Sequence, residues 1–206
     1  MRTYLCINGI RQDPSKELWT DKAASFFDAY PEESVRGDKY EYKVGLIKSW
    51  SKRKHIDGLK SRIATLSRST AVYPIAHSHG CELVICAIKE TDVFVPELHL
   101  FAPAIPRSFE RNHLNDLSEK IGHLFLYGSR NDKALIVGGV SRFLFGWAGL
   151  GYGDLGRTGP EEVSVAWTKP PMRLTTVWKN EYDHGTWFDG ENLEKSMSQI
   201  VRSEAS

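Results

Sequence analysis

Short apolar runs rich in β-branched and aromatic residues alternate along the chain with stretches whose apolar positions repeat at helical spacing. Runs bounded by turn residues predict buried strands, and apolar positions three and four apart predict helices. Strands joined by helices are typical of a parallel sheet covered on both faces. We expect an α/β fold, a three-layer sandwich with a mostly parallel sheet of about six strands flanked by helices. The predicted strands are 3–7, 40–46, 71–76, 98–102, 123–127 and 174–178.

Four stretches carry the helical pattern: 18–30, 52–66, the residues that follow Gly80, and 193–201. The second of these also carries a run of lysines and arginines between positions 52 and 62. Such a run is typical of a solvated helix face, and the alternative is a binding patch for an acidic partner. The apolar stripes predict that each helix packs against the sheet.

Composition and length fit one folded domain over residues 1–206. The chain is 41% hydrophobic and 26% charged, which is enough apolar material for a core. Lysine and arginine total 27 against 26 aspartate and glutamate, a net charge of +1. Such a balance gives no overall field for nucleic acid or an anionic membrane, so neither is an expected partner.

Three cysteines cannot pair completely, and Cys6, Cys81 and Cys86 all lie in apolar stretches. They predict buried thiols in a reducing compartment. The chain starts without the apolar run of a secretory signal, and no window reaches a membrane-spanning length. We therefore expect a cytoplasmic protein without an integral membrane segment.

One segment carries a signature of catalysis. An apolar run leads into Ser78, which has the small residues Ala76 and Gly80 two positions before and after it, and a helical pattern follows at once. This segment resembles the nucleophile elbow, G-x-S-x-G, of the α/β-hydrolase family, with alanine in place of the first glycine. The resemblance implies that Ser78 is a nucleophile at the carboxyl edge of the sheet. The alternative is an ordinary turn between a strand and a helix.

The family order of serine, acid and histidine continues downstream of Ser78. Asp132 lies in the loop after the predicted strand 123–127, and His184 lies beside Gly185 after the last predicted strand. The resemblance implies that Asp132 orients His184, which takes the proton of Ser78. Asp183 is a competing acid, and Asp132 could instead cap the following helix.

The oxyanion hole of the family implies two backbone donors. The amide of His79, which follows the nucleophile, is the first, and the amide of Gly9 or Ile10 is the second. The pair Asn8-Gly9 is also a common turn. Because the chain begins at the strand that carries this loop, it resembles a minimal serine esterase or lipase-like member of the family.

The segment 137–160 holds eight glycines among large apolar residues, which predicts a loop or lid. Phe143, Phe145 and Trp147 are candidates for an acyl pocket, and the alternative is a helix packed on the core. An apolar acyl pocket favours a small-molecule carboxylic ester, with a lipidic ester or a thioester as alternatives. The rival hypothesis is a catalytically silent module of the same fold that binds a protein or a small ligand.

No cofactor or metal is expected. His77 and His79 flank Ser78, but side chains at that spacing point to opposite sides of an extended segment. The sequence from Gly151 to Gly156 matches G-x-G-x-x-G, but no clear strand precedes it and no helical pattern follows before Pro160. We therefore interpret it as a glycine-rich loop.

Overall fold

The computed structural model describes residues 1–9, 18–42, 52–105, 117–137, 153, 155–159 and 172–203. At its centre lies a six-stranded parallel sheet with the strand order β2-β1-β3-β4-β5-β6. The expected parallel sheet of about six strands is therefore confirmed. Its strands are β1 (Arg2–Ile7), β2 (Val35–Tyr40), β3 (Ala71–His77), β4 (Val95–Phe101), β5 (Ile121–Gly128) and β6 (Arg173–Trp178).

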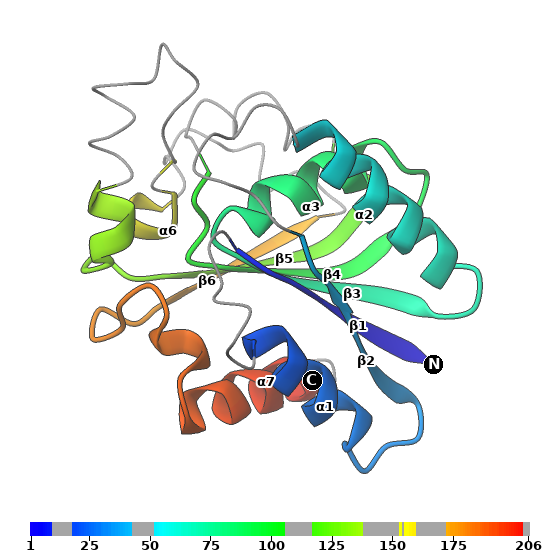
Figure 1. Cartoon of the computed structure of the whole chain (residues 1–206), viewed down its shortest axis with the longest axis horizontal. Helices are drawn as coiled ribbons and strands as arrows, with labels where there is room; N and C mark the ends of the chain where they lie inside the picture. Colours follow the sequence, from blue (N-terminus) through cyan, green and yellow to red (C-terminus); the bar gives the residue numbers. More distant parts are fainter. Residues whose placement is uncertain are drawn as a thin grey trace.

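Helices cover both faces of the sheet and complete the three layers (Figure 1). The helices α2 (Lys52–Leu66) and α3 (Gly80–Lys89) lie on one face. The helices α1 (Trp19–Asp28) and α7 (Glu191–Ser203) lie on the other. Two short elements complete the fold: α6 (Leu155–Thr158) lies between β5 and β6 in the chain, and the 3-10 helix η4 (Thr186–Phe188) lies between β6 and α7. The three-layer sandwich is thus also confirmed.

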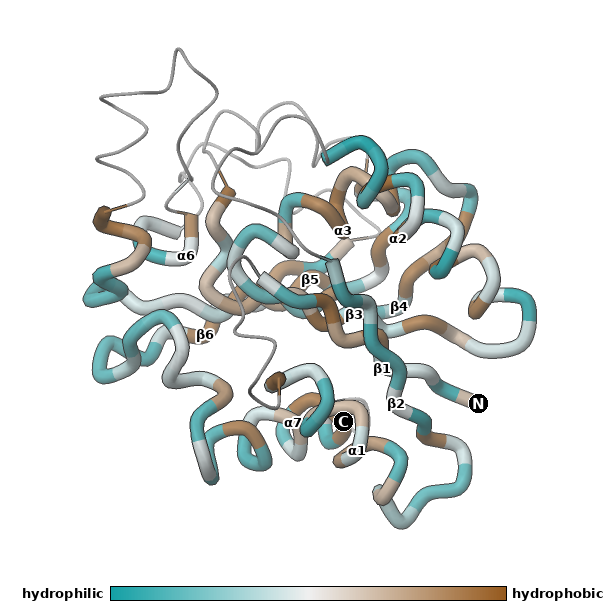
Figure 2. Tube along the Cα trace, viewed as in Figure 1, coloured by the Kyte–Doolittle hydropathy of each residue, from teal (hydrophilic) through white to brown (hydrophobic). Residues whose placement is uncertain are grey.

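Alternate residues of each strand enter two separate apolar cores. In β1, Leu5 and Ile7 pack with α2 and α3, whereas Tyr4 and Cys6 pack with α1 and α7. This alternation follows from the pleat of the strand, which points successive side chains to opposite faces. Figure 2 shows the apolar residues of the central strands, in brown, enclosed between the helical layers.

The prediction for the second strand was wrong. The sequence pattern placed it at 40–46, whereas β2 runs from Val35 to Tyr40; residues 43–46 lie outside the described part of the chain. The reason is that β2 forms an edge of the sheet, where most of its side chains are half-buried or exposed. Its polar residues, such as Arg36 and Asp38, hid the strand from a search for apolar runs.

Most of the lysines and arginines of α2 are paired with acidic residues of this chain. Arg53 binds both carboxylate oxygens of Glu90, at 2.7 and 2.8 Å. Arg62 binds both oxygens of Asp38 at 2.7 and 2.6 Å. These pairs favour the solvated helix face over the binding patch, because their positive charge is compensated within the fold.

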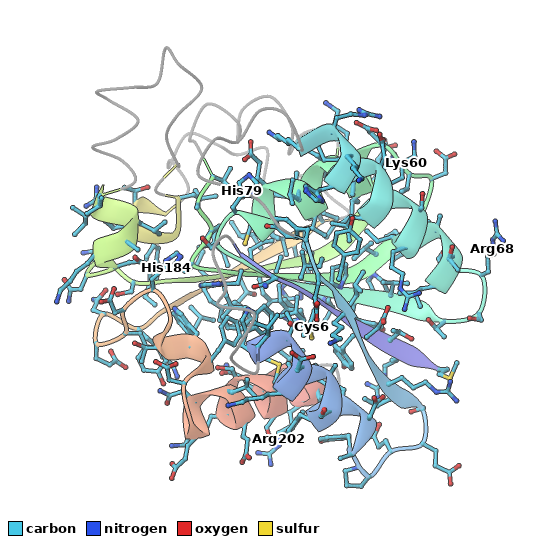
Figure 3. The ribbon with its side chains drawn as sticks, viewed as in Figure 1. Cys6, Lys60, Arg68, His79, His184 and Arg202 are labelled. Carbon is cyan, nitrogen blue, oxygen red and sulfur yellow. The ribbon has the colours of Figure 1, made fainter. Side chains whose placement is uncertain are left out.

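The carboxyl ends of all six strands meet at one edge of the sheet, as parallel pairing requires. Open α/β sheets bind their ligands at this edge, in the crevice between loops. In Figure 3, His184 lies at this edge, and Arg68 lies at the opposite end of the molecule. The loops after β3, β5 and β6 carry the three residues that the sequence nominates for catalysis.

Candidate active site

Ser78 occupies the sharp turn between β3 and α3. Its backbone φ is 55°, in the left-handed region that is strained for residues with a side chain. The turn is held on both sides, because the Ser78 amide donates to the carbonyl of Phe101 at 3.0 Å and the Ser78 carbonyl accepts from the amide of Ala104 at 3.2 Å. Its side chain is partly exposed. A strained, pinned and accessible serine is the geometry of a nucleophile elbow.

The structure explains why Gly80 and Ala76, the residues two positions after and before Ser78, are small. A Cβ added to Gly80 would lie 2.2 Å from the carbonyl oxygen of Asn8, so only glycine lets α3 pass so close to the end of β1. Ala76 lies buried within the sheet, paired with Ile7 on one side and Leu100 on the other. The strand accepts the alanine methyl group at the position where the family pattern has glycine.

Asp132 follows the turn at 130–131, just after the end of β5. It is fully buried, with 0% of its surface exposed. Its Oδ1 accepts the backbone amide of Leu135 at 2.9 Å and so caps the helical turn at 133–137. Its Oδ2 accepts the Nδ1–H of His184 at 2.8 Å. The two alternatives raised by the sequence, cap and partner of the histidine, are therefore both present, one on each oxygen.

His184 lies in the loop between β6 and η4, and its side chain is 21% exposed. Because the carboxylate of Asp132 accepts the proton on Nδ1, Nε2 is the ring nitrogen left to act as a base. Within the described residues, no hydrogen bond joins Ser78 Oγ to His184. Catalytic hydrogen bonds are often long in structures without substrate and tighten when it binds.

The competing acid, Asp183, contacts backbone instead of the imidazole. Its Oδ1 accepts the amide of His184 at 2.8 Å and the amide of Lys133 at 3.1 Å. These bonds, led by the one from His184, hold the pKa of the Asp183 carboxyl below its usual range. Asp183 therefore ties the histidine loop to the loop that carries Asp132.

Gly9 packs directly against the proposed nucleophile. A Cβ at this position would lie 3.0 Å from Ser78 Cβ and 3.2 Å from His77 Nδ1. The Gly9 amide, however, donates to the side-chain oxygen of Asn8 at 2.7 Å, so it is not presented as an oxyanion donor in this conformation. Ile10, the alternative donor, lies outside the described residues. The His79 amide lies immediately after Ser78, at the start of α3.

The side chain of His79 is buried beneath the elbow, where it meets a buried acid. Its Nε2 lies 3.4 Å from Glu82, which is only 6% exposed. Lys52 of α2 binds the other oxygen of Glu82 at 2.6 Å, and the hydroxyl of Tyr42 lies 3.4 Å from His79 Nδ1. This buried group anchors the start of α3 to α2, and the sequence patterns did not reveal it.

His77, the last residue of β3, contacts the histidine loop. Its Nε2 lies 3.0 Å from the carbonyl oxygen of His184, and the two rings are 4.7 Å apart. Burial, with the nearby charge of His184, lowers the pKa of His77 to about 3. His77 is therefore neutral at physiological pH. Sequence reasoning considered it only as a metal ligand, and the described residues include no cluster of three or more His, Cys, Asp or Glu side chains suited to a metal.

Cys81 is a second potential nucleophile near the elbow. Its thiol is fully buried and donates to the carbonyl of Ala76 at 3.3 Å. Burial raises the pKa of this thiol well above its ordinary value. A protonated, enclosed thiol is a packing group and does not compete with Ser78.

Aromatic side chains that the sequence analysis did not single out line the sheet face beside His77. Trp19, at the start of α1, stacks on Phe188 of η4 with ring centroids 4.0 Å apart. Phe188 meets the edge of the His77 ring at 5.3 Å. The predicted acyl-pocket residues Phe143, Phe145 and Trp147, and most of the predicted lid 137–160, lie outside the described residues. Within its described part, Leu155–Thr158 form the short helix α6, so the expectation that no helix precedes Pro160 was wrong. The Gly156 amide of this helix donates to the carbonyl of Pro103 at 3.0 Å.

A family model for α/β hydrolases of unknown function, DUF900, matches residues 34–159. The match covers more than half of the chain, which therefore belongs to this family of α/β hydrolases. The family assignment agrees with the resemblance carried by the sequence around Ser78. A comparison with curated protein sequences gives no match.

Solved structures share the fold at low sequence identity. An uncharacterized protein from Bacillus cereus is 13% identical, with a TM-score of 0.59 over 100% of this chain and 60% of its own. Est1E from Butyrivibrio proteoclasticus is 13% identical, with a TM-score of 0.53 over 99% and 88%. A putative YdeN-like hydrolase from Pectobacterium atrosepticum is 16% identical, with a TM-score of 0.51 over 97% and 92%. At these identities the likeness establishes the fold alone.

Proposed function

We propose that this protein is a serine hydrolase that cleaves a small carboxylic ester or thioester through Ser78, His184 and Asp132. The observation that carries the proposal is the 2.8 Å hydrogen bond from His184 to the buried Asp132, at the sheet edge where Ser78 occupies its strained turn. Membership of an α/β-hydrolase family supports the class of reaction. The name Est1E of a structural neighbour is consistent with an ester substrate.

In the first half of the reaction, Ser78 Oγ attacks the carbonyl carbon of the substrate while His184 Nε2 takes the hydroxyl proton. The carbonyl electron pair moves onto its oxygen, and the amide of His79 donates to that oxyanion. Asp132 keeps the imidazole in the tautomer with hydrogen on Nδ1 and stabilises the imidazolium that forms. The tetrahedral intermediate then expels an alcohol or a thiol, which leaves with the proton from His184.

In the second half, water attacks the acyl group on Ser78 while His184 again accepts a proton. Collapse of this second intermediate returns the proton to Ser78 Oγ and releases the carboxylic acid. For Gly9 to act as a second oxyanion donor, its amide must first break the hydrogen bond to the side chain of Asn8. The acyl pocket at Phe143, Phe145 and Trp147 stays a prediction, and the reaction as proposed requires no cofactor.

The proposal is tested by turnover of an activated short-chain ester and of the matching thioester by the purified protein. Wild type is expected to hydrolyse one or both, with an initial burst of alcohol or thiol if the acyl-enzyme accumulates. Ser78→Ala is expected to lose this activity. Ser69→Ala, which removes an exposed hydroxyl from the turn before β3, is the matched control and is expected to keep it. Equal activity of Ser78→Ala and wild type would refute the proposal.

A cytoplasmic location is part of the same proposal. It is supported by the three cysteines, which all carry free thiols. In the described part of the chain, every helix is too short or too polar to cross a bilayer. The proposed substrate is a small molecule, and no nucleic acid partner is proposed.

A further inference from the structure

The backbone of His184 is held at both of its polar groups. Asp183 accepts its amide at 2.8 Å, and His77 lies 3.0 Å from its carbonyl oxygen. With the bond from its imidazole to Asp132, His184 therefore has three anchors. Asp132 lies in the loop after β5, and Asp183 is bonded to the Lys133 amide of that loop. His77 belongs to β3, the strand that leads to the proposed nucleophile.

The contact between His77 and His184 assigns the tautomer of His77. A carbonyl oxygen can only accept a hydrogen bond, so His77 Nε2 carries the hydrogen and donates to the carbonyl of His184, a residue 107 positions later in the chain. His77 is 8% exposed, and its neutral state is consistent with a single ring hydrogen on Nε2. The contact is partly buried, so loss of this donor would remove a hydrogen bond that is shielded from water on one side.

The ring of His77 is fixed by its neighbours, so its N–H has a defined direction. Phe188 and Trp19 each meet it edge-on, at centroid distances of 5.3 and 6.3 Å. Phe188 belongs to η4, which directly follows the loop of His184. His77 thus contacts the histidine loop through the carbonyl of His184, and the following element η4 through the ring of Phe188.

We propose that His77 is a positioning residue, which sets the place of His184 relative to Ser78 by donating its Nε2–H to the His184 carbonyl. The proposal rests on the roles of Ser78 and His184 proposed above. Because His77 and Ser78 are adjacent, the hydrogen bond ties the base to the strand that holds the nucleophile. A displacement of about 1 Å in such a site can cost about 100-fold in rate.

The test compares variants of His77 that keep or remove the donor. His77→Gln keeps an N–H near the position of Nε2, and His77→Phe keeps an aromatic ring without a donor. We expect His77→Phe to lower kcat by about 10- to 100-fold with little change in KM, and His77→Gln to restore most of that loss. His77→Met is a second variant without a donor, for use if His77→Phe does not fold.

His99→Phe is the matched control. His99 is fully buried on β4 and bonds to Glu97 and Tyr127, so its loss removes a buried histidine without touching the His184 loop. We expect this control to lower the melting temperature while kcat stays within about twofold of wild type. A loss of kcat in His99→Phe equal to that in His77→Phe would overturn the proposal, as would a His77→Gln variant no better than His77→Phe.

A readout that does not depend on turnover separates this proposal from the proposed function. The Nδ1 proton of His184, bonded to Asp132, is expected to give a low-field proton NMR signal. We expect that signal in wild type and in His77→Gln, and a shifted or broadened signal in the donor-free variants. If wild type hydrolyses nothing but the signal changes in this way, the proposed function fails and the positioning role stands. An unchanged signal and unchanged kcat in His77→Phe would overturn the role itself.

Discussion

His184 and Asp132 lie 52 positions apart in the chain, yet the imidazole Nδ1–H of one donates to the buried carboxylate of the other at 2.8 Å. Parallel strands bring them together, because β5 and β6 are neighbours and both end at the same edge of the sheet. The second oxygen of Asp132 caps the helical turn that follows it. The cap fixes the carboxylate, and the fixed carboxylate orients the imidazole.

The two aspartates near His184 are expected to differ sharply in their effect on activity. Asp132→Asn keeps an oxygen to cap Leu135 but presents an amide to the imidazole, which favours the wrong tautomer. We expect kcat to fall by about 1,000-fold or more. Asp183→Asn keeps the Oδ1 oxygen that accepts both backbone amides, so its kcat should fall less than about 10-fold.

The measurement is steady-state hydrolysis of the same activated ester by both variants, with circular dichroism to show that each is folded. A larger loss in Asp183→Asn than in Asp132→Asn would assign the orienting role to Asp183 instead.

The lowered pKa of His77 predicts that the protein loses stability in acid. Burial lowers its pKa from an ordinary value near 6.5 to about 3, so below pH 6.5 the unfolded chain takes up a proton that the folded chain refuses. The free energy of unfolding then falls as pH falls, by up to about 1.4 kcal/mol per pH unit for this one proton, until pH nears 3. Urea unfolding of wild type and His77→Gln at several values between pH 6.5 and 4 measures the effect.

The difference in unfolding free energy between wild type and His77→Gln excludes the effect of the carboxylates, because these titrate in both proteins. We expect a steeper loss of stability with acid in wild type than in His77→Gln. Parallel pH dependences of the two proteins would show that His77 takes up its proton equally in the folded and unfolded states.

Gly80 is expected to tolerate no side chain. A Cβ there would meet the Asn8 carbonyl oxygen at 2.2 Å, which is backbone and cannot swing away. We expect Gly80→Ala to lower the free energy of unfolding by about 3 kcal/mol or more. Gly185→Ala is the control, because nothing lies within 4 Å of a Cβ at that position, and its effect should stay within about 0.5 kcal/mol. Equal stabilities in urea unfolding would contradict this account of the elbow.

The partly buried ion pair of Lys52 and Glu82 predicts a loss of stability when Lys52, its less buried partner, is removed. Lys52→Met leaves the carboxylate of Glu82, with its side chain 8% exposed, without its cation. We expect a loss of about 1 to 3 kcal/mol, reduced from the effect of a fully buried pair because Lys52 is itself partly exposed. Lys54→Met, an exposed position on the same helix, is the control. Equal thermal melting of the two variants would show that the pair contributes nothing.

Local sequence patterns were enough to predict most of the sheet. Buried strands such as β1 and β3 are nearly continuous apolar runs, and they appear at the predicted places with end shifts of one residue. The edge strand β2 was misplaced because most of its side chains are half-buried or exposed and several of its residues are polar. Strand β2 is specified by its pairing with β1, which no local pattern records.

Less of the candidate site than of the fold could be predicted from the sequence. The pattern around Ser78 is local, so the elbow could be identified from small residues at fixed spacing. The choice between Asp132 and Asp183 depends on which carboxylate reaches the imidazole of His184, and this follows from the meeting of two distant loops. The contact of His77 with the carbonyl of His184 leaves no trace in the sequence, because a backbone acceptor has no residue signature.

The central claim is that Ser78 is an activated nucleophile, and intact-mass analysis after treatment with a fluorophosphonate probe tests it most directly. The probe reacts with activated serines and needs no knowledge of the substrate. We predict one adduct on wild type and none on a folded Ser78→Ala variant. An adduct that persists in Ser78→Ala, or a folded wild type that forms none, would contradict the claim, and the second result would favour a binding module built on this fold.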